Sequence, residues 1–212
     1  MKNSNHEIIT SIFSGLLSCK TITDVDSVLD KNNIGNEFRF SEKKYPKINF
    51  TIQRNEIENI LQNNSLSKDY CITDASQLDT LGKILYALAW KNGDLQKIKH
   101  IIKGILAKEE DETENAVVFV QFGKYLSGNP VEPIVDQHVL RAFDLYQNRN
   151  TPNIIEDYSS INLVTKKHVG LITEYKIWLN TALTKELRQL PDYRYHVDKV
   201  LFATGKYLKN NK

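Results

Sequence analysis

The sequence predicts a mainly α-helical protein that carries a small mixed segment at its N-terminal end. Apolar residues recur at helical spacing through most of residues 74–212, and capping residues precede several of these runs. Alternation of apolar and polar residues, the pattern of a strand, is confined to residues 48–52, which allows one strand pair at most. We therefore expect a helical domain over residues 74–212, with residues 1–73 packed on it or appended to it.

The N-terminal segment is expected to hold three helices joined by irregular chain. The first lies within residues 8–17, where polar residues interrupt the apolar ones too often for a signal peptide. We therefore expect this helix to remain in the mature chain. Thr23 and Asp24 can cap a second, short helix, and Asn55 can cap a third over residues 56–62.

The helical domain is expected to contain six helices. Asp74, Asp94 and Asp136 each open one of them, because an Asp side chain accepts hydrogen bonds from the free N–H groups of a first helical turn. Trp90 and Trp178 end or cross apolar stripes and are expected in the core. The expected helices span residues 74–92, 94–105, about 114–126, 136 to the polar connection at 148, 165–183 and 193–208.

Composition excludes several classes of protein. The chain has 28 Lys+Arg against 26 Asp+Glu, a formal net charge of +2, so a uniformly basic coat for nucleic acid is excluded. Cys19 and Cys71 are too few for a disulfide framework or a cysteine zinc site, and reduced thiols favour a cytoplasmic protein. The histidines lack metal-ligand spacing, so we expect neither a metal nor a cofactor. No apolar stretch reaches the roughly 20 residues of a membrane span, so we expect no membrane partner.

Charge is distributed unevenly along the chain. Residues 165–212 hold ten Lys and Arg residues against four Asp and Glu residues, with Tyr193, Tyr195 and Tyr207 interleaved. This pattern is typical of surfaces that grip phosphates and stack bases, and it fits equally a basic tail that complements a helix dipole. On the first interpretation, the expected nucleic-acid-binding residues include Lys166, Lys167, Arg194 and Lys199.

The most specific segment reads Pro-Ile-Val-Asp-Gln-His-Val-Leu-Arg, from Pro133 to Arg141. It follows an apolar run over residues 116–123 that ends in Phe-Gly. This core resembles the P-V-D-x-H-V-x-R segment of the helix-hairpin-helix DNA glycosylase superfamily, which includes endonuclease III and the 8-oxoguanine glycosylases. The resemblance covers roughly residues 74–212, and the nine-residue core is its sharp part.

The resemblance implies an enzyme that excises a modified or damaged base from DNA. Asp136 matches the family's catalytic aspartate, whose carboxylate stabilises the oxocarbenium-like charge at the sugar as the base leaves. His138 and Arg141 would support the site or reach the DNA backbone. The flipped base would occupy a pocket between two helical lobes. Lys108 and Lys124 are the candidates, by proximity, for the family's lysine, and Lys124 is taken here as the second candidate catalytic residue.

One part of the family pattern is replaced in this chain. The family's hairpin has a Gly-x-Gly that grips a phosphate, whereas residues 103–114 have no such motif and include five acidic residues. Base excision without lysine-dependent strand cleavage is the first hypothesis. The alternative is a catalytically inactive member that binds DNA or a protein partner, as in a bacterial defence system.

Each candidate residue also has an ordinary structural role open to it. Asp136 can be a helix cap alone, and a cap can also be catalytic. His138 can be a histidine satisfied within the fold, and Lys124 a solvated surface lysine.

Overall fold

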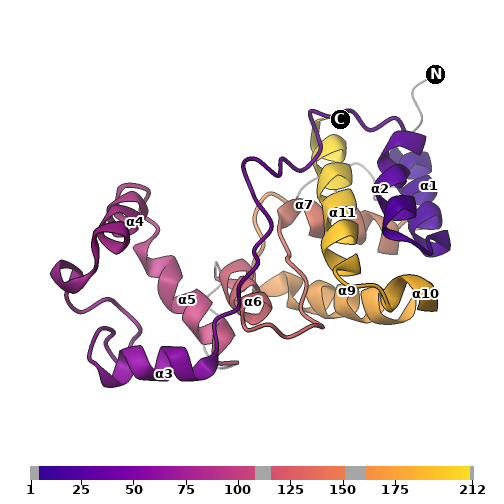
Figure 1. Ribbon diagram of the computed structural model, residues 1–212. Helices are drawn as coiled ribbons and strands as arrows, with labels where there is room; N and C mark the ends of the chain where they lie inside the picture. The colour runs from indigo at the N-terminus through magenta and orange to yellow at the C-terminus, as the bar shows by residue number, and fades with distance from the viewer. Residues whose placement is uncertain (1–4, 108–115, 151–160, 211–212) are drawn as a thin grey trace. The chain divides into compact units, whose positions relative to one another are not determined.

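The computed structural model describes residues 5–107, 116–150 and 161–210, which form helices and connecting segments (Figure 1). A mainly helical fold is confirmed, because the described residues form no strand and have one isolated bridge, between Leu66 and Ile72. They divide into two compact units, residues 1–48 with 133–212 and residues 49–132. The boundary expected between residues 73 and 74 lies inside the second unit. The first unit instead combines helices from both ends of the chain.

The first unit begins with two amphipathic helices, α1 (Asn5–Ser18) and α2 (Ile22–Lys31). The apolar face expected for α1 is confirmed, with Ile12, Phe13 and Leu16 fully buried. The cap of α2 differs from the expected Thr23 and Asp24: the Thr21 hydroxyl accepts the Asp24 N–H, and the Asp24 carboxylate accepts the Thr21 N–H.

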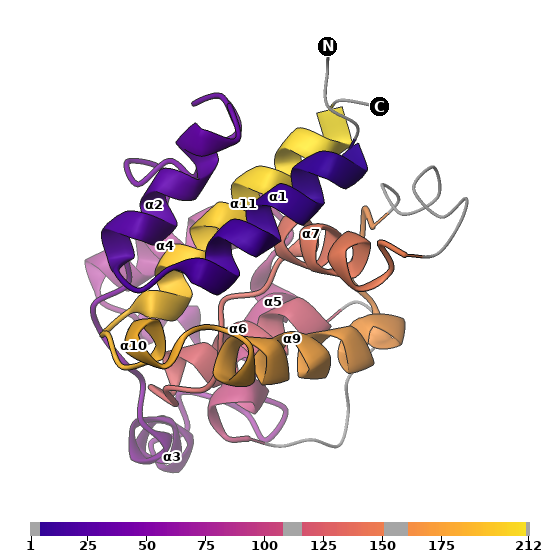
Figure 2. The same cartoon turned by 90° about the vertical axis from the view of Figure 1, so that its right-hand side faces the viewer.

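The C-terminal part of the first unit is built around α7 (Gln137–Gln147) and α11 (Tyr193–Asn210). These helices pack against each other over much of their length, and α11 also lies beside α1 and α2 (Figure 2). The segment expected as one helix over residues 165–183 begins as the 3-10 turn η2 (Lys166–His168) and continues as α9 (Val169–Thr181). A short helix that the sequence did not predict, α10 (Lys185–Arg188), follows.

An aromatic cluster joins α1, α7 and α9. The Phe13 ring stacks on Tyr146 with the centroids 3.9 Å apart, and Phe143 lies 5.1 Å from Tyr175. Trp178 of α9 contacts the rings of Phe13 and Phe143 and is buried, which confirms the expectation that it lies in the core. Aromatic area of this kind is the largest single source of burial in a small core.

The second unit contains α3 (Arg54–Gln62), η1 (Ala75–Gln77), α4 (Thr80–Lys91), α5 (Leu95–Ile105) and α6 (Val117–Leu126). The single helix expected over residues 74–92 is wrong: Asp74 caps only η1, and the Asp79 carboxylate caps α4 by accepting the Gly82 N–H. Gln53 rather than Asn55 caps α3. Residues 48–52 form no strand, and the Ile52 N–H donates to the Leu126 carbonyl.

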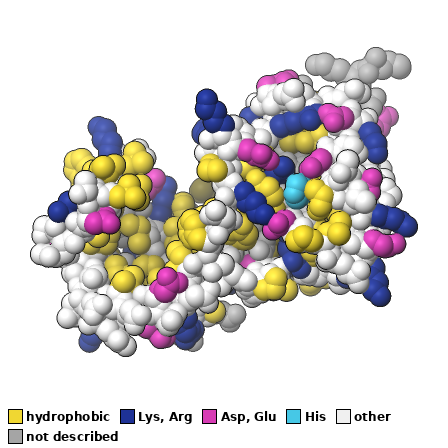
Figure 3. Space-filling view, viewed as in Figure 1, with side chains coloured by type: hydrophobic (Ala, Val, Ile, Leu, Met, Phe, Trp, Pro, Cys, Tyr) yellow, Lys and Arg dark blue, Asp and Glu magenta, His cyan; other side chains and the backbone are white. Residues whose placement is uncertain are grey.

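The apolar stripe of α4 faces outward, contrary to the core expected from its spacing. Leu81, Ile84, Leu85 and Leu88 are 56% to 63% exposed, and Trp90 is exposed as well. Apolar side chains gather over α4 in the space-filling view (Figure 3). A 12-residue helix without a buried side chain is marginal alone, so little of the stability of α4 comes from burial of its apolar stripe. None of the helices in the described ranges has the length and apolar character of a membrane span.

Glycine sets the distance between α7 and α11. A Cβ on Gly205 would lie 1.9 Å from the His138 carbonyl oxygen, closer than any real contact. The backbones of the two helices therefore touch at a point where no larger residue fits.

Replacing Gly205 with alanine is expected to destabilise the first unit, because the two backbones must move apart. We expect a loss of about 1–3 kcal/mol, which lowers Tm by roughly 2–12 °C in a chain of this size. The matched control is Gly170→Ala on α9, where nothing lies within 4 Å of the added Cβ and the Tm should stay the same or rise. Calorimetry measures both, and an equal loss in the two variants would contradict the close crossing.

Candidate active site

Asp136 is the N-cap of α7, as the sequence predicts. Its backbone is extended, with φ −133° and ψ 179°, and its Oδ1 atom accepts the N–H groups of His138 at 2.8 Å and Val139 at 2.9 Å. Within the described ranges, no hydrogen bond reaches its Oδ2 atom. One oxygen therefore fixes the carboxylate, and the second is left for another group.

The environment of Asp136 acts on its charge in two directions. Burial raises the pKa of the Asp136 carboxyl above its ordinary value. The two N–H groups and the Arg141 guanidinium favour the charged form and lower that pKa in part. The carboxylate is thus desolvated yet supported by positive and dipolar groups, a combination that recurs at functional sites.

His138 serves as a hydrogen-bond acceptor within α7. Its Nδ1 atom lies 2.9 Å from an Nη atom of Arg141. A guanidinium only donates, so Nδ1 accepts and the ring is neutral with its proton on Nε2. Burial also lowers the pKa of His138. The ring meets Phe202 of α11 edge-on, with the centroids 5.0 Å apart.

Arg141 is fully buried and holds three segments together. Besides His138, its guanidinium donates to the carbonyl of Gly205 on α11 at 3.0 Å and to the carbonyl of Ile161. The expectation that Arg141 reaches a DNA backbone does not fit this geometry, because its donors face protein carbonyls in the core. Arg141 therefore stabilises the packing of the segments next to Asp136.

Two residues of this cluster were missed by the sequence reasoning. The fully buried carboxyl of Asp198, on α11, accepts the Ile134 N–H at 3.1 Å and the Tyr175 hydroxyl at 2.5 Å. Burial raises the pKa of Asp198 to about 8 and that of Tyr175 well above its ordinary value. The available signal was a lone Asp between Val197 and Leu201, on the apolar face of an expected helix.

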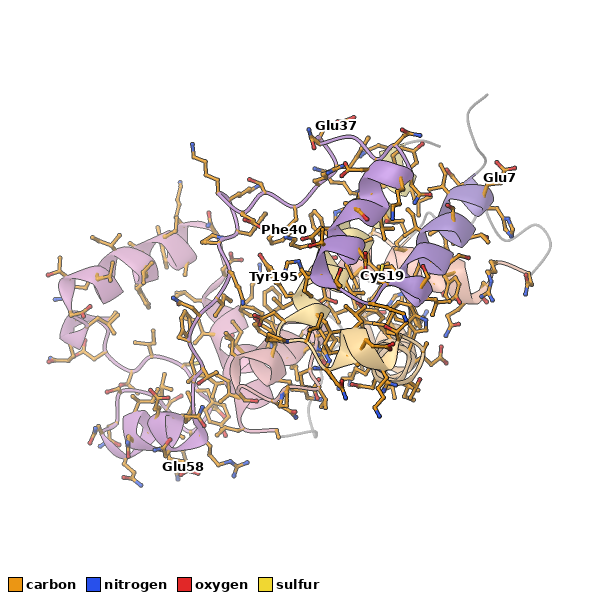
Figure 4. All side chains as sticks on the ribbon, turned by 45° about the vertical axis from the view of Figure 1, so that its right-hand side comes forward. Glu7, Cys19, Glu37, Phe40, Glu58 and Tyr195 are labelled. Carbon is orange, nitrogen blue, oxygen red and sulfur yellow. The ribbon has the colours of Figure 1, made fainter. Side chains whose placement is uncertain are left out.

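The basic face expected at the C-terminal end is largely occupied by the protein itself. The Lys199 ammonium donates to Glu42 at 2.9 Å, and the Arg194 guanidinium donates to the side-chain oxygen of Asn180. Tyr193 is buried, and Tyr195 packs edge-on against Phe40, as the sticks in Figure 4 show. Residues 37–47 therefore cover much of the surface on which bases were expected to stack.

The remaining candidate lysines in the described chain are spread over both units. Lys166 and Lys167 are exposed on η2 in the first unit, and no ion pair joins either to another described residue. Lys124 is half-buried on α6, in the second unit. Lys108 and the acidic residues 109–114 lie outside the described residues.

No second site for a small ligand emerges from the polar groups of the described chain. Residues 5–107, 116–150 and 161–210 contain no group of three or more His, Cys, Asp and Glu that could hold a metal ion. A cavity of about 280 Å³ lies between α1 and α2 beside Cys19, where burial raises the thiol pKa to about 11. Another, of about 530 Å³, lies beside Tyr70 in the second unit. Neither cavity is lined by Asp136.

No protein-family model matches the sequence, and no curated protein or solved structure matches it. The function of the site therefore has to follow from the chemistry of Asp136 and its neighbours.

Arg141→Met is expected to destabilise the protein by about 2–5 kcal/mol, because the carbonyls of Gly205 and Ile161 lose their buried donor. Lys167→Gln removes an exposed charge and should change the stability by less than about 0.5 kcal/mol. Denaturant titration of both variants measures the difference. Equal stability of the two would show that Arg141 is not a core residue.

Proposed function

We propose that this protein is a DNA glycosylase-like hydrolase that excises a modified or damaged base, with Asp136 as its essential carboxylate. The proposal rests on the different environments of the two carboxylate oxygens of Asp136. Oδ1 is fixed by two N–H groups at the start of α7, while Oδ2 accepts no hydrogen bond within the described chain. A carboxylate held in this way is preorganised to face a developing positive charge.

Base excision develops a positive charge of this kind on the sugar. When the C1′–N bond breaks, its electron pair leaves with the base and the sugar becomes oxocarbenium-like. The ionised Asp136 carboxylate stabilises that cation, a water molecule adds to C1′, and the proton that the water loses neutralises the departed base. Asp136 must be ionised for this step, so excision falls as the pH drops through its raised pKa.

The nucleic acid would contact exposed cations of the first unit. Lys166 and Lys167 keep their charges free of ion pairs with described residues, whereas Lys199 is neutralised by Glu42. We therefore assign phosphate contacts to Lys166 and Lys167 before Arg194 and Lys199. Water is the proposed nucleophile, so the strand stays intact after the base is released.

A second candidate function is supported by a different observation. The outward apolar stripe of α4, with Lys83 and Lys91 on the same helix, is a surface of the kind that binds a protein partner. On this alternative, the hydrogen bonds of Asp136 serve only as a helix cap and the protein is catalytically inactive.

Asp136→Asn separates the two functions. An Asn side chain caps a helix as well as Asp does, so Tm should change by less than about 3 °C. If the carboxylate is catalytic, the variant should lose base release by about 100-fold or more, because the group that stabilises the sugar cation is gone. The assay uses duplexes that contain 8-oxoguanine, thymine glycol, uracil or an alkylated base, and it detects abasic sites by their cleavage in alkali.

Asp79→Asn is the matched control, since Asp79 caps α4 by the same kind of hydrogen bond. It should retain full base release. Activity that survives in Asp136→Asn, or a wild-type protein that neither binds nor processes any of the four duplexes, would leave the binding function as the better account.

A further inference from the structure

A second buried carboxyl group, that of Asp198, lies near Asp136. Asp198 lies on α11 with its side chain fully buried, and the charge of Asp136 is near enough to raise the pKa of Asp198. A buried carboxyl is costly unless it has hydrogen-bond partners, so its retention here requires an explanation. The cap of α7 does not supply one, because Asp136 makes both cap hydrogen bonds by itself.

The hydrogen bonds of Asp198 join three separate segments. Its Oδ1 atom accepts the hydroxyl of Tyr175 on α9 at 2.5 Å, and its Oδ2 atom accepts the Ile134 N–H at 3.1 Å. Ile134 lies two residues before Asp136, in the extended segment that leads into α7. Val135, between them, is buried. The position of this segment is therefore tied to α9 and α11 through one carboxyl group.

We propose that Asp198 is a positioning residue for Asp136: held by the Tyr175 hydroxyl, it accepts the Ile134 N–H and so fixes the segment from which the Asp136 carboxylate projects. This inference rests on the proposed role of Asp136 in base excision. It gives the buried acid a task at the site, since a carboxylate that stabilises a cation must hold its place to a fraction of an ångström.

The charges around the pair decide which acid is ionised. His138 and Arg141 of α7 face Asp136, the charge of Arg141 favours the ionised form of Asp136, and Lys209 of α11 acts on His138. Tyr175 of α9 and Arg194 of α11 face Asp198, and Tyr193 acts on Tyr175.

Two neighbouring buried carboxyls do not ionise together at neutral pH. Burial raises the pKa of Asp198 to about 8, and the charge of Asp136 adds to that rise, so Asp198 is mainly protonated at neutral pH. In that state, one oxygen of Asp198 accepts the Ile134 N–H and the other shares a hydrogen bond with the Tyr175 hydroxyl.

The test compares two substitutions at Asp198 in the full-length protein. Asp198→Asn keeps an acceptor oxygen for the Ile134 N–H and places a neutral amide NH2 beside the Tyr175 oxygen, to which it donates, so it mimics the neutral acid with the direction of the Tyr175 hydrogen bond reversed. Asp198→Leu has a similar volume and makes neither hydrogen bond. The measurements are hydrogen exchange of the Ile134 amide and ¹³C NMR titration of the Asp136 carboxyl, and neither requires a substrate.

We expect Asp198→Asn to keep wild-type exchange at Ile134 and to lose the titration step near pH 8. Asp198→Leu should speed exchange of the Ile134 amide by about tenfold or more, since a lost hydrogen bond is worth about 1.4 kcal/mol or more in a buried setting. It should also lower the pKa of Asp136 toward its ordinary value, because the released segment lets water reach the carboxyl. Asp144→Asn, at the other end of α7, is the control and should leave both measurements unchanged.

Where excision is detected, kcat should fall roughly 10- to 100-fold in Asp198→Leu, with KM unchanged, and Asp198→Asn should restore it. If the wild type excises no lesion, the proposed function fails while the two NMR measurements still decide the role of Asp198. If Asp198→Leu does not fold, Tyr175→Phe takes its place and should speed Ile134 exchange in the same direction. Wild-type exchange at Ile134 and an unchanged titration of Asp136, in whichever of the two variants folds, would overturn the proposal.

Discussion

The contact between α7 and α11 is the constraint on which the rest of the first unit depends. Gly205 lets the two backbones touch at His138, and the buried Arg141 guanidinium then bonds the Gly205 carbonyl across the crossing. Because the helices are this close, Asp198 of α11 reaches the segment that leads into α7. The same crossing leaves His138 as the acceptor for Arg141 and as the edge contact of Phe202. Separating the helices would therefore undo the packing and the polar cluster together.

The polar cluster places charged and polar groups in the buried part of the first unit. Arg141, Asp198 and Tyr175 are all buried, and each has a hydrogen-bond partner on another segment, while the Nε atom of Arg141 has none among the described residues. Such an arrangement adds little net stability compared with an apolar core, but it specifies one geometry and is expensive to leave half-satisfied. At the edge of this cluster stands Asp136, with one oxygen fixed and the other without a hydrogen bond in the described chain. The cluster thus forms a rigid support for the Asp136 carboxylate.

Local signals in the sequence predicted local features well. The spacing of Ile12, Phe13 and Leu16 identified the buried face of α1, and the helix start at Asp136 followed from its capping chemistry. Features that depend on distant segments were missed, because periodicity does not tell which neighbour a face will meet. The apolar residues of α4 have the spacing of a buried face but are exposed. Arg141, which the sequence suggested as a cation available to DNA, is buried and donates to the carbonyls of residues 161 and 205. The basic C-terminal stretch likewise proved to be covered in part by residues 37–47, through pairs such as Lys199 with Glu42.

The central claim is that the Asp136 carboxylate is placed to meet a positive charge on a sugar. It is tested most directly by comparing the affinity of the protein for two duplexes, one with a cationic pyrrolidine in place of a nucleotide and one with an uncharged tetrahydrofuran. The cation resembles the transition state, so the wild type should bind the pyrrolidine duplex at least about 100-fold more tightly, and Asp136→Asn should lose most of this preference. Equal affinity of the wild type for both duplexes would contradict the account.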